Sequence, residues 1–247
     1  MISSRAGESG NIMFLILIAV VLFAALSFAV TMSNRGGGSD MNAENMRILA
    51  SRITQHAMSY ENAVVRLRIS KGIAENAIDF DTPRAPGYDN PGCAGDICHV
   101  FNAEGGQAVY IDVDRKWLDG SQAGGAHYGY WLFTGGICVP GIGLGDDASC
   151  NADPANNELI ALVPWVLKDI CIQINRKLGI PLDNGNPPRL TGNAWPAANE
   201  QFIGSFAAGE TIIDTNNVLY GHPEACFEGG GTPPNGSYHY YRVIFPR

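Results

Sequence analysis

The stretch Ile12–Val30, IMFLILIAVVLFAALSFAV, is an unbroken apolar run of 19 residues and decides how the rest of the chain is interpreted. It contains no charged side chain and one hydroxyl, that of Ser27. As an α-helix it would measure about 28 Å, close to the roughly 30 Å hydrocarbon thickness of a bilayer. The run therefore predicts a transmembrane helix over residues 11–32, preceded by a leader or cytoplasmic N-terminus at residues 1–10.

Two other interpretations of the run stay open. The triplet Ser27-Phe28-Ala29 carries small residues at both ends, so a signal peptidase could cut after it and release a secreted domain. The run could instead be a buried core helix, although glycines follow it. Arg5 and the terminal amine precede the run, partly offset by Glu8, and Arg35 follows it, so flanking charge favours a cytoplasmic N-terminus only by a small margin.

The rest of the chain has the composition of a folded, acidic domain. Hydrophobic residues make up 46% of the 247 residues, charged residues 16%, and the formal net charge is −8. Nucleic-acid binding needs clustered Lys and Arg, so we expect no nucleic-acid partner. Three glycines at 36–38 follow the apolar run, and each costs a helix about 1 kcal/mol relative to alanine. We therefore expect a Gly-rich linker or hinge at residues 33–40 and a globular extracytoplasmic domain at 41–247.

All six cysteines lie after the apolar run, and their even number is typical of disulfides in an oxidising compartment. A metal site is the weaker alternative, because the sequence contains no Cys-x-x-Cys pair. Six cysteines permit 15 pairings, so connectivity does not follow from the sequence. Proximity along the chain suggests the following pairs: Cys93–Cys98, Cys138–Cys150 and, by remainder, Cys171–Cys226.

The periodicity of the domain predicts an α+β fold. Apolar residues recur every three or four positions from Ala43 to about Lys71, which indicates an amphipathic helix ending near Gly72. This apolar stripe comprises Met46, Leu49, Ile53, Ala57, Tyr60, Val64 and Leu67. A second helix is expected over Glu158–Leu178, with Gly179 as its C-cap and with Pro164 either kinking it or marking its true start.

Runs rich in β-branched and aromatic residues predict an antiparallel sheet against which the amphipathic helix packs. The expected strands are Cys98–Phe101, Ala108–Val113, Tyr128–Phe133, a short segment within Thr211–Tyr220, and Tyr238–Phe245. Aromatic residues crowd two of these segments. Pairing within the sheet is their simplest role, and an exposed aromatic face that binds a glycan or a partner subunit is the alternative.

A short leader, an apolar helix, an amphipathic helix, antiparallel strands and disulfides occur here in the order that resembles the type IV pilin and pseudopilin superfamily. The resemblance implies that a prepilin peptidase cuts after Gly10, leaving Asn11 as the mature N-terminus. The family usually has an aromatic residue or Met at that position and Glu at the fifth mature position, where this chain has Leu15.

The resemblance also implies that the apolar helix packs into a filament core with identical or related subunits. The residues expected to mediate this assembly are Phe14, Leu15, Leu17, Val21, Leu22, Phe23, Leu26 and Phe28. The family fold places a sheet domain outside that core. The expected function is a structural subunit of a cell-surface filament or secretion apparatus, located in the inner membrane with an extracytoplasmic domain or in a surface filament. The alternative function is a membrane-anchored or secreted envelope module that binds a glycan or protein and does not polymerise.

One acidic loop suggests a calcium site, and nothing in the chain suggests catalysis. The carboxylate and amide oxygens of Asp146, Asp147, Asn151, Asp153 and the nearby Glu158 are the hard ligands that Ca²⁺ prefers. Their spacing is not that of an EF-hand, and a solvated acidic turn is the alternative. The five histidines are scattered and no hydrolase, P-loop or dinucleotide motif occurs, so we expect no enzymatic activity and no other cofactor.

Overall fold

The computed structural model describes residues 10–144, 150, 154–191, 201–206 and 210–247, and the side chains of 10, 11, 29–41, 154 and 210 are not described. The chain divides into two compact units, Met1–Asn45 and Met46–Arg247. Helix α1, Gly10–Val65, contributes to both, and a π-helical turn, Arg66–Ser70, follows it. Among the described residues, no helix combines the length and apolar composition needed to cross a bilayer. The transmembrane helix therefore stays a prediction.

The predicted interruption at the glycines is wrong at the level of secondary structure, because the backbone is helical through residues 33–40. Three glycines weaken a helix, but turns already formed on both sides let it propagate through them at a cost of about 1 kcal/mol per glycine. The predicted end of the amphipathic helix is confirmed. Lys71 caps the π-helical turn, and Gly72 follows with a φ of 65°, a conformation that glycine adopts without strain.

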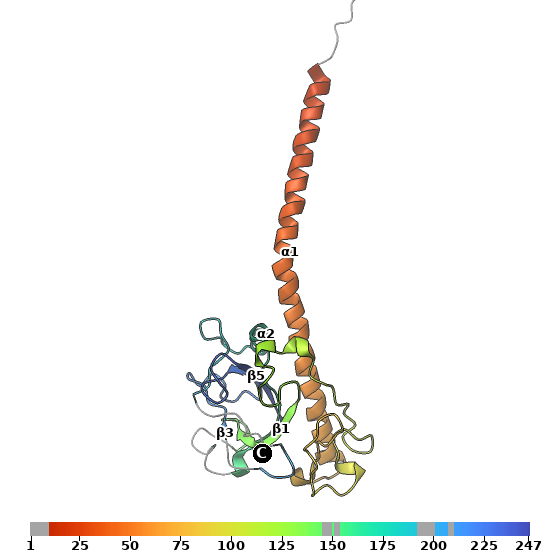
Figure 1. Ribbon diagram of the computed structural model, residues 1–247, viewed down its shortest axis with the longest axis vertical. Helices are drawn as coiled ribbons and strands as arrows, with labels where there is room; N and C mark the ends of the chain where they lie inside the picture. Colours follow the sequence, from red (N-terminus) through yellow and green to blue (C-terminus); the bar gives the residue numbers. More distant parts are fainter. Residues whose placement is uncertain (1–9, 145–149, 151–153, 192–200, 207–209) are drawn as a thin grey trace, which may run out of the picture. The chain divides into compact units, whose positions relative to one another are not determined.

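The second unit is built on a five-stranded sheet in the order β3-β1-β2-β5-β4. Figure 1 labels three of these strands, β1, β3 and β5. The strands are β1 (Leu132–Cys138), β2 (Glu158–Val163), β3 (Glu210–Thr211), β4 (Glu224–Glu228) and β5 (Tyr238–Phe245). All neighbours pair antiparallel except the short β3, which runs parallel to β1. The α+β class and the antiparallel sheet are thus confirmed, and the predicted strand over Tyr238–Phe245 is present with the same bounds.

Both faces of the sheet are buried, which explains the main errors in the predicted elements. One face packs against α1, through residues that include Ile53, Tyr60 and Leu67, and against α2, Lys168–Leu178. The other face is covered by irregular segments that contribute residues such as Leu190 and Leu219. A strand buried on both faces shows no alternation of apolar and polar residues.

Strand β2 is the clearest case, since all six of its residues are buried and the segment was predicted as helix. Pro164 closes this strand, and α2 begins four residues later, with Gly179 as the expected left-handed C-cap. The predicted strands Cys98–Phe101 and Ala108–Val113 are also wrong, since turns and irregular backbone occupy them. The strand expected over Tyr128–Phe133 overlaps β1 only in part, because β1 begins at Leu132 and continues to Cys138.

The described part of α1 in the second unit is fixed to the sheet by charge as well as by packing. Arg242 of β5 donates from Nε to Glu61 of α1 at 2.7 Å and pairs with Glu224 of β4. The Tyr240 hydroxyl donates to the same Glu224 carboxylate at 2.8 Å. Burial raises the pKa of Glu224, and the nearby Arg242 guanidinium opposes that rise. This network joins one helix and two strands at one side chain.

Candidate functional site

Helix α1 presents two kinds of surface, one in each unit. Every described side chain from Ile12 to Phe28 is exposed, and the large apolar ones range from 38% exposed at Ile18 to 79% at Met13. All eight predicted assembly residues belong to this segment: Phe14, Leu15, Leu17, Val21, Leu22, Phe23, Leu26 and Phe28. Gly10 and Asn11 are the first two residues of helix α1, and their surroundings lie outside what the structure describes.

Between Met46 and Val65 the same helix is amphipathic. Its inner face carries Ile53, Ala57, Tyr60 and Val64, all fully buried, which confirms the predicted apolar stripe. Its outer face also holds large apolar side chains: Ile48, Met58 and Val65 are 45%, 47% and 41% exposed. An outer face of this kind exceeds what core packing requires, because the helix already buries one full stripe against the sheet.

The edge of the sheet at β4 is closed to further strands. Asn175 of α2 accepts a hydrogen bond from Cys226 N–H and donates one to Cys226 C=O, both at 2.8 Å. Two residues along, Glu228 N–H donates to Pro188 C=O and Glu228 C=O accepts from Leu190 N–H. The outward backbone groups of Cys226 and Glu228 are therefore all occupied, and an incoming strand would find no free ladder there.

The three disulfides pair as proximity along the chain suggested: Cys93–Cys98, Cys138–Cys150 and Cys171–Cys226. The long bridge, Cys171–Cys226, ties α2 to β4 beside the Asn175 hydrogen bonds. Each pairing agrees with the expectation of an oxidising compartment. With the cysteines oxidised, their sulfurs are not available as metal ligands.

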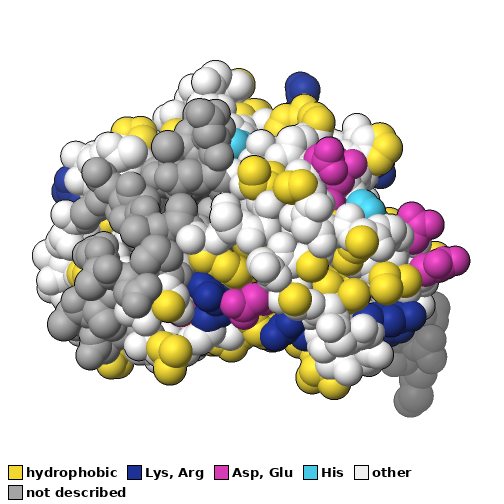
Figure 2. Space-filling model, turned by 90° about the horizontal axis from the view of Figure 1, so that it is seen from below, with side chains coloured by type: hydrophobic (Ala, Val, Ile, Leu, Met, Phe, Trp, Pro, Cys, Tyr) yellow, Lys and Arg dark blue, Asp and Glu magenta, His cyan; other side chains and the backbone are white. Residues whose placement is uncertain are grey.

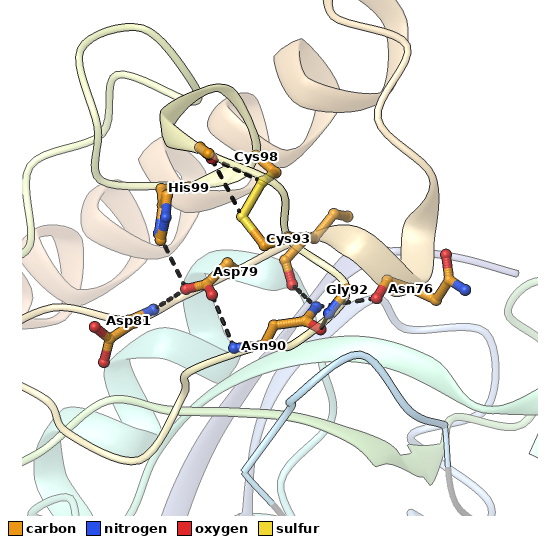
Figure 3. The surroundings of a disulfide bond; sticks show 10 residues. Asn76, Asp79, Asp81, Asn90, Gly92, Cys93, Cys98 and His99 are labelled. Atoms are coloured by element: carbon orange, nitrogen blue, oxygen red, sulfur yellow. Dashed lines mark hydrogen bonds and ion pairs between the residues drawn. A yellow bond between two sulfur atoms is a disulfide. The ribbon is translucent and has the colours of Figure 1, made fainter.

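A cluster of Asp79, Cys93 and His99 brings three candidate metal ligands within 4.8 Å of one another, but its bonding is structural (Figure 3). Cys93 is committed to its disulfide. The buried Asp79 carboxylate accepts from Asp81 N–H and from Asn90 N–H, the latter at 2.9 Å, and lies 3.2 Å from His99 Nδ1. Both carboxylate oxygens of Asp79 therefore accept hydrogen bonds that hold together the loop between residues 76 and 99.

The predicted calcium ligands Asp146, Asp147, Asn151 and Asp153 lie outside the described residues. Glu158, the fifth member of that hypothesis, is fully buried at the start of β2 and does not lie in a loop. Its Oε2 accepts from Val139 N–H at 2.7 Å, while its Oε1 has no partner among the described residues. Burial raises the pKa of Glu158 to about 7.

The histidines occupy separate environments. His239 is buried in the sheet, its ring stacked on Phe227, and burial lowers its pKa to about 3. His56 lies against Trp117 with ring centroids 5.7 Å apart. Ser237 Oγ lies 2.7 Å from His239 Nε2, but Trp165 N–H donates to His239 Nδ1, so in the neutral ring Nε2 carries the proton and donates to the serine instead of acting as its base. On the described part of the face in Figure 2, Lys, Arg, Asp and Glu side chains lie dispersed among hydrophobic ones.

Comparison of the chain with protein-family models, with curated proteins and with solved structures finds no match. The assignment of function therefore depends on the surfaces described above.

Proposed function

We propose that the chain is a pilin-like structural subunit that assembles with copies of itself or related subunits through the apolar part of α1. Before assembly, residues 11–32 anchor it in a membrane as a single helix, with the disulfide-bonded domain on the extracytoplasmic side. The observation that carries this proposal is that every described side chain from Ile12 to Phe28 is exposed.

An exposed apolar surface of that extent is unfavourable in water, so we expect lipid or another protein to cover it. Burying a Leu or Phe side chain contributes about 1.5–3 kcal/mol, and this segment contains thirteen large apolar residues that are exposed in the described chain. Lipid satisfies such a segment, because a helix bonds all its backbone groups internally. A bundle of like helices satisfies it equally, so transfer from lipid to filament exposes no polar group.

The outer face of the second half of α1 supports the same proposal. Ile48, Met58 and Val65 extend apolar surface beyond the segment expected in the membrane. The closed edge at β4 argues against growth by strand addition there. A repeated head-to-tail contact along α1 can instead extend without closing into a ring.

Two matched charge insertions test the proposal in cells that express the full chain. Leu22→Arg places a cation in the middle of the apolar run, at a cost of about 2.5–3.5 kcal/mol for membrane insertion. Gln55→Arg places the same cation on an exposed position of α1 within the domain. We expect Leu22→Arg to lose both carbonate-resistant membrane association and sheared filaments, and Gln55→Arg to keep them.

Equal behaviour of the two variants would contradict the proposal. Carbonate-resistant association of the wild-type chain, without filaments in sheared material under the electron microscope, would favour a second candidate function, that of an anchored binding module. A pocket in the domain is the observation that favours this second candidate.

A further inference from the structure

The domain contains a pocket of about 310 Å³ whose walls are aromatic and uncharged. Its volume lies at the lower end of the range for small-molecule sites and fits a ligand of monosaccharide size. The side chains that form it come from three separate parts of the chain: Pro86, Tyr88, His127, Tyr130, Trp131 and Gln201.

The wall that carries Tyr88 is held by the loop that Asp79 and Asn90 organise. Asn90 Nδ2 donates to Asn76 C=O at 2.9 Å and to Ile78 C=O at 2.8 Å, and Asn90 N–H is bound to Asp79 (Figure 3). The Tyr88 hydroxyl donates to Trp131 C=O at 3.2 Å and accepts from Phe133 N–H at 3.1 Å. The loop and the start of β1 therefore form one rigid wall.

The opposite wall is equally well fixed. Trp165 Nε1 donates to Ala126 C=O at 2.8 Å, which holds the turn that carries His127 and Tyr130. His127 has a φ of 57°, and Gly129 has a φ of 87°. The Trp131 ring meets Tyr60 edge-on, with centroids 5.1 Å apart. The pocket is thus preformed, which reduces the ordering that a ligand must impose.

Two ring nitrogens of the pocket residues have no hydrogen-bond partner in the described chain: Nε1 of Trp131 and Nε2 of His127. Both atoms are buried, and Trp131 as a residue is only 1% exposed. Buried indole N–H groups normally find a partner, so an unpaired one calls for an explanation. Burial lowers the pKa of His127, so its imidazole is neutral at neutral pH and can donate or accept according to its tautomer.

We propose that this pocket binds a neutral hexopyranose. Sugar hydroxyls both donate and accept, so they match the chemistry of an unpaired indole N–H and of an imidazole nitrogen in either tautomer. The C–H face of the ring can lie against Tyr130, which is 51% exposed. An apolar side chain would leave both nitrogens unpaired, and no residue lining the pocket offers a charge to pair with an ionic ligand. This inference stands independently of the filament proposal.

Binding is tested with the full chain in a zwitterionic detergent that has no sugar headgroup. The probes are the methyl glycosides of glucose, galactose, mannose and N-acetylglucosamine, measured by saturation-transfer NMR and by titration calorimetry. We expect at least one glycoside to bind. His127→Phe keeps a ring of similar shape without the nitrogen, and Tyr130→Ala removes the exposed aromatic face. Each should weaken binding about tenfold, the equivalent of about 1.4 kcal/mol.

Tyr220→Ala is the matched control, because Tyr220 is 45% exposed and does not line the pocket. It should leave binding unchanged, and thermal melting should show that all three variants are folded. Failure of all four glycosides to bind would overturn the inference. Equal loss in Tyr220→Ala, or binding of an aromatic or proline-rich peptide with no response to the sugars, would also overturn it.

Discussion

The two described halves of α1 share one backbone conformation and differ in what surrounds their side chains. From Ile12 to Phe28 every described side chain is exposed, and nearly all are apolar. From Met46 to Val65 an apolar stripe is buried against a sheet, and Glu61 is paired with Arg242. The second half is a structural element of a domain that needs no partner to bury its core. The described side chains of the first half bury no such stripe, and we propose that lipid or other subunits cover them.

The largest expected difference between the two halves of α1 comes from truncating one large side chain in each to alanine. Tyr60 packs edge-on against Phe101, Trp131 and Phe133 at centroid distances of 5.1–5.7 Å. Tyr60→Ala should lower the free energy of unfolding by about 3–5 kcal/mol, because it opens a cavity in this aromatic cluster. Leu22→Ala should leave it within about 0.5 kcal/mol, since Leu22 is exposed.

Urea unfolding of the full chain in detergent, followed by tryptophan fluorescence, measures both truncations. A comparable loss in Leu22→Ala would show that the first half also stabilises the domain, and the contrast between the halves would then disappear.

The three disulfides lie in the second unit, so we expect them to stabilise the domain and not the first half of α1. Cys171–Cys226 closes a loop with a sequence separation of 55, and Cys93–Cys98 closes one of 5. In the chain-entropy model their removal costs about 4 and about 2 kcal/mol respectively. The double Cys→Ala variants should therefore lower the thermal midpoint in that order, without changing carbonate-resistant membrane association. A reversed order, or loss of membrane association, would contradict this division of roles.

A smaller and pH-dependent effect is expected from Glu158. Its folded pKa of about 7 lies above the ordinary value of 4.5, because burial disfavours the carboxylate. The folded state therefore holds the proton more tightly than the unfolded chain. Below about pH 4.5 both states are protonated and stability is unaffected. As the pH rises towards 7 the unfolded chain ionises first, and on the order of 3 kcal/mol of stability is lost.

Glu158→Gln keeps an oxygen to accept from Val139 N–H and removes the titration. The difference in unfolding free energy between the variant and the wild type should shift in favour of the variant as the pH rises from 4 to 8. A constant difference across that range would show that Glu158 does not titrate in this way. Membrane association should not follow this pH dependence, because the described side chains from Ile12 to Phe28 carry no charge.

Elements that are specified by neighbouring residues, such as a helical repeat or a run of strand-forming side chains, could be predicted from the sequence. The stripe from Ile53 to Leu67 follows the helical period, and Tyr238–Phe245 is rich in strand formers. The three disulfides joined the cysteines that proximity suggested, and Gly179 is the expected left-handed C-cap.

Features that depend on tertiary context could not be predicted. The burial of Glu158–Val163 on both faces removes the alternation that marks a strand, so the segment resembled a helix. The pocket joins Tyr88, His127 and Gln201, which lie far apart in the sequence and share no spacing. The crowding of Tyr130 and Trp131 is visible in the sequence. That Trp131 Nε1 and His127 Nε2 lack a partner in the described chain is evident only from the fold.

Photocrosslinking in cells can test whether the first half of α1 packs against other copies of the chain. A photoreactive phenylalanine derivative is placed at Leu22 or at the exposed Gln55, and the products are separated by mass after irradiation. We expect a ladder of multiples of the chain mass from position 22, well above the yield from position 55. Products from position 22 that contain only a single copy of the chain would contradict this expectation.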